Sequence, residues 1–172
     1  MKTFFLSLLL LYIFVANTNK KINLWSINLK LNHQFFKAKP DTKSTFQANC
    51  NVGFKYSMEI GDSIKMTSYA YQDPYKSWIK QPKNDYLLKH EKLHFDIAEH
   101  CHRQFKRKYI LILRENISSE TKKNKIKTLF TQEILNLSKI QKMYDLQTKH
   151  SLDTIKQMQW NDSIYNLLKA NK

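Results

Sequence analysis

The residues His90, Glu91 and His94 form an H-E-x-x-H motif, His90-Glu91-Lys92-Leu93-His94. On a helix, histidines four residues apart lie about 40° apart around the axis and one turn along it, so both imidazoles can reach one zinc ion. Glu91 lies beside them, where its carboxylate can take a proton from a zinc-bound water whose pKa falls to about 7. The motif therefore predicts a zinc-dependent hydrolase with Glu91 as the general base.

A zinc site needs a third protein ligand, and the motif helix does not supply one. The other acids and histidines of that helix lie too far around or along it: Asp96, Glu99, His100 and His102. The ligand must therefore come from another segment. We expect His150, which lies in the break between two predicted helices, with Asp145 or another carboxylate as the alternative and His33 as the least favoured.

The second half of the chain is predicted to be helical. Apolar residues recur at intervals of three and four from residue 86 to about residue 109 or beyond, which is the period of an amphipathic helix. A second helix is predicted over residues 120 to about 144, capped by Ser118 or Ser119, and a third over residues 153–170. The motif lies near the start of the first of these helices.

The first half of the chain is predicted to be extended. Residues 22–31, 45–58 and 63–71 are rich in β-branched and aromatic residues, and Gly61 and Asp62 mark a turn between the last two segments. We expect at least three strands in an antiparallel sheet. Strands followed by helices predict an α+β fold: a small antiparallel sheet followed by three helices, with the H-E-x-x-H motif on the first long helix.

The first residues have the layout of a secretory signal peptide. Met1 and Lys2 precede the almost wholly apolar residues 4–15, which are followed by Ala16 and a polar run. This apolar run is shorter than the roughly twenty residues that span a bilayer. We therefore expect residues 1–18 to be a cleaved signal peptide and residues 19–172 to form a single domain. The mature protein is predicted to be secreted or periplasmic, with no stable membrane span.

Net charge and cysteine content say less about function. The chain has 29 Lys and Arg against 14 Asp and Glu, a net charge of +15, which favours anionic partners in general. Because the lysines are scattered and do not form a basic patch interleaved with aromatic residues, no specific nucleic-acid partner is predicted. Cys50 and Cys101 fit either one disulfide in an exported chain or two separate thiols.

Four segments, in order along the chain, carry a family likeness: residues 31–40 with Phe36, Lys37 and Pro40; Lys76-Ser77-Trp78; residues 87–99; and Tyr144-Asp145, Thr148, His150, Gln157 and Trp160. They resemble a bacterial family of uncharacterised function, described as predicted secreted zinc-dependent proteases and grouped with the zincin-like metallopeptidases. The chain departs from the family at Leu93 and Ser151, where members often have glycine. The resemblance implies a secreted peptidase on a zincin-like fold, acting on peptide or protein substrates, which include those of the cell envelope.

Tyr144 is a candidate for a second catalytic role because it lies near the expected third ligand. By analogy with metallopeptidases in general, its hydroxyl is expected to hydrogen-bond the oxyanion of the tetrahedral intermediate, and packing at a helix end is the alternative. The competing function is a non-catalytic zinc-binding envelope protein on the same fold. Glu91 favours the enzyme, because a structural zinc site has no use for an adjacent base.

Overall fold

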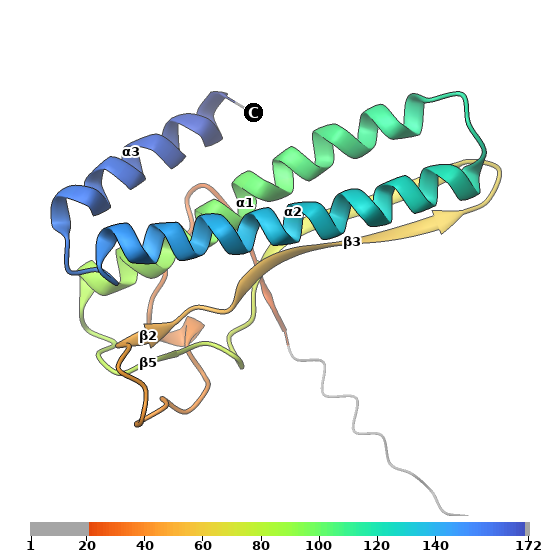
Figure 1. Cartoon of the computed structure of the whole chain (residues 1–172). Helices are drawn as coiled ribbons and strands as arrows, with labels where there is room; N and C mark the ends of the chain where they lie inside the picture. Colours follow the sequence, from red (N-terminus) through yellow and green to blue (C-terminus); the bar gives the residue numbers. More distant parts are fainter. Residues whose placement is uncertain (1–20, 171–172) are drawn as a thin grey trace, which may run out of the picture.

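The computed structural model describes residues 21–170, in which a long β hairpin lies along two long helices. The hairpin consists of β3 (Val52–Ile60) and β4 (Ile64–Gln72), and the helices are α1 (Asp85–Arg114) and α2 (Ser119–Thr148) (Figure 1). A third helix, α3 (Thr154–Ala170), packs on α1. The predicted α+β fold, a small antiparallel sheet with three helices, is confirmed. The predicted signal peptide, residues 1–18, lies outside the described residues.

The strands form two separate antiparallel sheets instead of one continuous sheet. The short β1 (Asn23–Leu24) extends the hairpin by pairing with β4, whereas β2 (Ala48–Asn49) pairs with β5 (Trp78–Ile79). The predicted strand over residues 45–58 is interrupted between β2 and β3, because the Asn51 N–H donates to the side chain of Ser77 and not to a neighbouring strand. The predicted turn at Gly61 and Asp62 is confirmed, since it joins β3 to β4.

The helices begin where capping chemistry places them. The Asn84 side chain accepts from the N–H of Leu87 at the start of α1, and the Ser118 hydroxyl accepts from Thr121 at the start of α2. The first helix ends at Arg114, within the predicted extension beyond residue 109, and the second continues past its predicted end, to Thr148. Within residues 21–170, no helix combines the length and the apolar composition that a membrane span requires.

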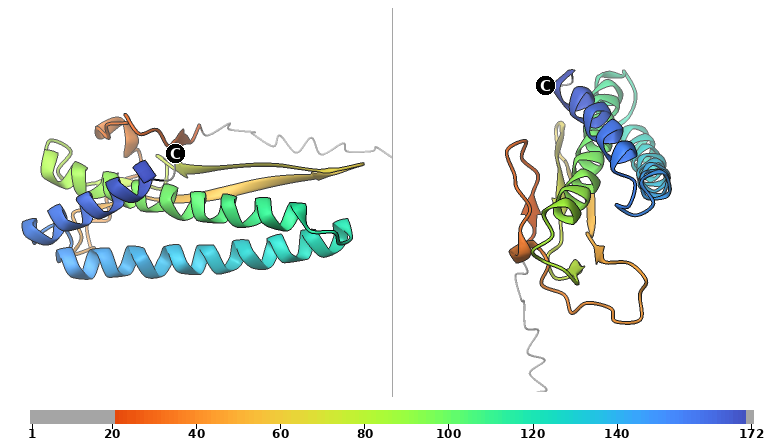
Figure 2. Two further views of the ribbon diagram at one scale, coloured as in Figure 1. Left: turned by 90° about the horizontal axis from the view of Figure 1, so that it is seen from above. Right: turned by 90° about the vertical axis from the view of Figure 1, so that its left-hand side faces the viewer.

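An aromatic cluster holds the hairpin against the two long helices, whose axes lie lengthwise beside the hairpin (Figure 2, left). Phe54 and Tyr56 from β3 meet Phe105 from α1 and Phe130 from α2, with ring centroids 4.9 to 5.7 Å apart. The rings are tilted or edge-to-face, the arrangements that aromatic quadrupoles favour. Phe105 is fully buried, so the cluster forms the centre of this part of the core.

A buried polar network also joins the sheet to the helices. His102 on α1 contacts the Ser68 hydroxyl of β4 at 3.0 Å and the Glu99 carboxylate at 2.9 Å. Arg103 donates to Glu99 and to the carbonyl of Leu168 on α3. Burial opposes ionisation of Glu99, but His102 and Arg103 outweigh it and lower the pKa of this carboxyl. Glu99 therefore fixes α1 against β4 and α3.

The aromatic cluster leads to a stability prediction. We expect Phe105→Ala to lower the free energy of unfolding by about 3–5 kcal/mol, because it leaves a cavity where four rings meet. Leu111→Ala, on the same helix but 62% exposed, should change it by no more than about 0.5 kcal/mol. Urea denaturation of both variants measures the difference. Equal losses would contradict the cluster as the centre of the core.

Candidate metal centre

Two histidines of α1 and one aspartate of α2 converge in the structure. The Nε2 atom of His90 lies 3.3 Å from Asp145 Oδ1, and the Nε2 atom of His94 lies 3.0 Å from the same oxygen. One potential ligand atom from each of these three residues lies within 4.8 Å of the other two, a group that can hold a metal ion. Donors bound to one tetrahedral zinc ion at about 2.0–2.1 Å lie roughly 3.3–3.4 Å apart, close to both distances.

The other ring nitrogen of each histidine is held by a glutamine. Gln141 on α2 donates from Nε2 to the carbonyl of His94, so its Oε1 is the atom that meets His94 Nδ1. Gln157 on α3 meets His90 Nδ1 through its Oε1 at 2.8 Å, and its amide nitrogen donates to Asn161. Because an amide oxygen only accepts, both Nδ1 atoms carry the proton. Both Nε2 lone pairs are therefore free to bind a metal.

This arrangement attracts positive charge. Burial opposes ionisation of Asp145, but its contacts with His90 and His94 outweigh burial and hold its pKa well below the usual value. Burial also opposes protonation of His94, yet Asp145 and Glu91 raise its pKa. Two nitrogen lone pairs and a carboxylate facing one another are stable only with a cation or a proton between them. The donor set therefore fits a divalent metal with nitrogen and oxygen ligands.

Glu91 is buried next to the two histidines. Burial raises the pKa of its carboxyl, and the charges of His94 and His90 partly oppose this. The backbone N–H of Cys50, which follows β2, donates to its carboxylate. Glu91 is therefore fixed from the strand side, and burial shifts its pKa in the direction that suits a general base.

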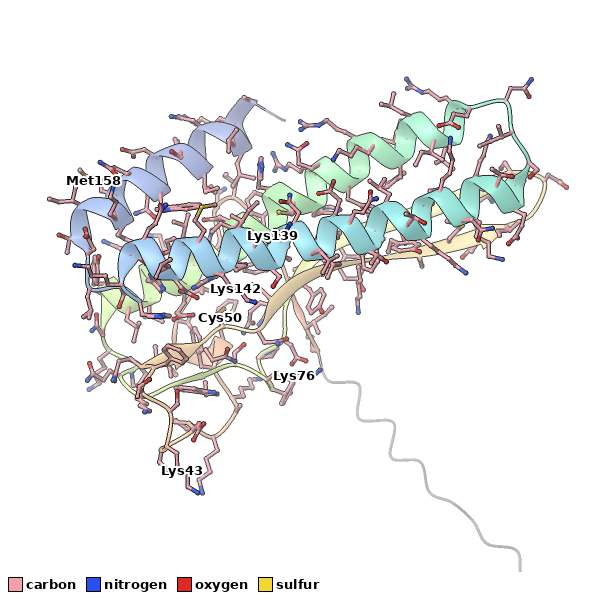
Figure 3. The ribbon with its side chains drawn as sticks, viewed as in Figure 1. Lys43, Cys50, Lys76, Lys139, Lys142 and Met158 are labelled. Carbon is pink, nitrogen blue, oxygen red and sulfur yellow. The ribbon has the colours of Figure 1, made fainter. Side chains whose placement is uncertain are left out.

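A cavity of about 280 Å³ opens at this cluster. Residues 46–52, which include β2, border one side, and His90, Glu91, His94 and Asp145 border the other. Figure 3 shows Cys50 on the chain that runs below α2. Cys50 and Cys101 are separate thiols, and burial raises the pKa of Cys50 well above its usual value. The metal donors and Glu91 thus share one cavity with an extended segment of backbone.

His150 borders the cavity but does not join the group of three donors. Its side chain is half exposed, its Nδ1 lies 3.7 Å from Asp145 Oδ1, and its ring packs 4.6 Å from that of Phe46. Lys149, His150 and Ser151 have φ values of 50°, 52° and 75°, in the left-handed region that glycine adopts more readily. Asp145, the alternative ligand, occupies the position between the two histidines. The assignment of His150 stays a prediction.

His33, the least favoured candidate for the third ligand, is not part of the metal-binding group. It is exposed in the short 3₁₀ helix η1 (His33–Phe35), and the three-donor group found among residues 21–170 does not include it.

Tyr144 lies behind the metal centre. Its side chain is fully buried, its ring stacks on that of His90, and its hydroxyl donates to Gln157 Oε1 at 2.7 Å. The same hydroxyl lies 2.8 Å from His90 Nδ1, on the opposite edge of the ring from Asp145. This position favours the alternative expected for Tyr144, a packing residue at the end of a helix, which here orients His90.

Gln141 is a supporting residue that the motif does not identify. It lies four residues before Asp145 on α2, so both side chains share one face of that helix. This four-residue spacing would identify Gln141 from the sequence if Asp145 were known to be a ligand. Ser77, in contrast, is buried in hydrogen bonds to Asn51, Gln72 and Asp73, which support the strands beside the cavity.

No protein-family model, curated protein or solved structure matches this chain.

The hydrogen bonds between the glutamines and the two histidines lead to a prediction about Zn²⁺ affinity. Gln157→Leu should weaken Zn²⁺ binding by about 10- to 100-fold, because His90 loses the acceptor that fixes its proton on Nδ1. Gln159→Leu, an exposed position two residues further along α3, should bind like the wild type. Competition with a chromophoric chelator measures both, and thermal unfolding of the metal-free variants checks their folding. Equal affinities in two folded variants would refute the orienting role of Gln157.

Proposed function

We propose that this chain is an exported zinc-dependent peptidase that hydrolyses peptide bonds at the cluster formed by His90, His94 and Asp145. The observation that carries this proposal is the buried carboxylate of Glu91, which shares a cavity with the three donors. A structural zinc site usually has four protein ligands and gains nothing from a buried acid beside them. The arrangement is the one that metal-assisted hydrolysis requires.

The residues of the chain divide the work of this reaction. His90, His94 and Asp145 would hold zinc, which when bound acidifies a water molecule and polarises the scissile carbonyl. Glu91 accepts the proton of the attacking water at its carboxylate and returns it to the leaving nitrogen. Gln141, Gln157 and Tyr144 keep the imidazoles in the ligating tautomer.

The strand side of the cavity supports a peptide as the substrate. Residues 46–52 border the cavity, and their backbone is extended where β2 pairs with β5. A peptide chain in an extended conformation can lie along such a segment and present its carbonyl to the metal side. The expected signal peptide at residues 1–18 supports an exported enzyme whose substrates lie in the cell envelope or outside the cell.

His150 supports the alternative, a non-catalytic zinc-binding envelope protein. Its Nδ1 lies 3.7 Å from Asp145 Oδ1. If His150 joined His90, His94 and Asp145, four protein ligands would close the site and leave no position for water. The two functions therefore differ in whether His150 binds the metal together with Asp145.

The third ligand can be identified by substitution. We expect Asp145→Ala to lower Zn²⁺ affinity by at least about 100-fold, the upper end of the loss seen on removing an outer-shell partner. His150→Ala should lower it by less than about tenfold, because the ring is half exposed and outside the donor group. Chelator competition measures both variants. Loss of zinc from His150→Ala alone would instead make His150 the third ligand, and loss from both would favour the closed site.

Glu91→Gln separates metal binding from catalysis. We expect this variant to keep stoichiometric zinc by elemental analysis and to lose about 10²–10⁴-fold in hydrolysis of a mixed peptide library, because the amide cannot accept the proton. Glu59→Gln, at an exposed position of β3, should retain full activity. A wild-type protein that holds zinc but cleaves no peptide in the library would refute the peptidase and leave the non-catalytic alternative.

A further inference from the structure

Four large apolar side chains are exposed around the turn that joins α2 to α3. Leu146, Leu152, Ile155 and Met158 are 76, 81, 64 and 59% exposed, and together we call them the α2–α3 tip. The turn lies at one end of the elongated molecule in Figure 1 and in the left view of Figure 2. Figure 3 shows Met158 on the outer side of α3. The tip is therefore a protruding apolar surface.

The tip is not part of the core between the helices. The inward face of α3 is formed by Gln157, Ile164 and Leu168, which are all buried. Ile155 and Met158 lie about 160° and 100° around the helix from Gln157, so they point outward. Single exposed apolar side chains are common on protein surfaces, but several large ones gathered at one turn indicate a contact surface.

The charges around the tip favour an anionic partner. Lys142, Lys149 and Lys156 are exposed and lie within one helical turn of tip residues in the sequence. The two acids of this region point elsewhere. Asp145 faces His90 and His94, and Asp153 accepts from the backbone N–H of Lys156 at the start of α3. Exposed lysines around protruding leucines are the arrangement by which proteins bind the surface of an anionic bilayer.

We propose that the α2–α3 tip docks on an anionic lipid surface. The four apolar side chains would enter the boundary between headgroups and acyl chains, while the lysine ammonium groups contact lipid phosphates. The proposal does not depend on the peptidase reaction. Because His150 belongs to the same turn and borders the cavity, docking would bring the metal centre close to the membrane and to substrates that lie on it.

Vesicle binding of the full chain tests the proposal. The wild type should sediment with phosphatidylglycerol-containing vesicles at low ionic strength and much less with pure phosphatidylcholine. The double variant Leu152→Asp/Ile155→Asp should lower the partition coefficient by at least about tenfold. The matched control, Leu111→Asp/Leu135→Asp, changes two side chains that are 62 and 58% exposed and adds the same charge. Equal binding by the two double variants, or no binding by the wild type, would overturn the proposal.

A depth measurement separates the tip from the apolar residues 4–15, which can bind lipid themselves. In vesicles with brominated acyl chains, the emission added by Leu152→Trp should be quenched, whereas that added by Leu135→Trp should not. The wild type, with its three tryptophans, gives the background. Quenching at neither or both positions would overturn the proposal. The proposal would also be overturned if the wild type bound no vesicles but dimerised with rising concentration, and the variant Leu152→Asp/Ile155→Asp did not dimerise.

Discussion

The hydrogen bonds to the Nδ1 atoms of His90 and His94 are the constraint on which the site depends. Gln141 comes from α2 and Gln157 from α3, so both helices must pack on α1 before the two imidazoles have a fixed tautomer. Once the Nδ1 protons are placed, both Nε2 lone pairs face Asp145. Packing of α2 and α3 on α1 therefore fixes the geometry of the candidate metal centre.

The strand side of the site supplies a hydrogen-bond donor to the buried carboxylate of Glu91, which would otherwise be unsatisfied. An isolated buried carboxylate is costly, and here burial raises its pKa while the Cys50 N–H and the two histidines favour the charged form. Cys50 can donate because the chain leaves β2 just before it and does not start β3 until Val52. The break between the two sheets, which divides the predicted strand, thus supplies a hydrogen-bond donor for Glu91.

What the sequence predicts well is local. The period of apolar residues predicts α1, and with it the common face of His90 and His94. The cap of α2 is predicted as Ser118 or Ser119, and it is Ser118, because capping depends on neighbouring residues. The choice between Asp145 and His150 is not local. It depends on how α2 ends over α1, and the hydrogen bond between Gln141 and His94 joins residues 47 positions apart. For the same reason, no motif could show that the Tyr144 hydroxyl lies behind His90.

The turn between α2 and α3 connects the metal centre with the exposed tip. The backbone N–H groups of Lys149 and His150 donate to the carbonyl of Asp145, so the turn that ends α2 also fixes the residue between the histidines. Three successive residues in the left-handed region make this turn costly, by roughly 1–3 kcal/mol for each non-glycine residue. Such a conformation persists only where surrounding contacts enforce it. Here hydrogen bonds to α2 carbonyls enforce it. The His150 N–H donates to Asp145 and the Asp153 N–H donates to Thr148, so the turn holds both Asp145 and the start of α3 in place.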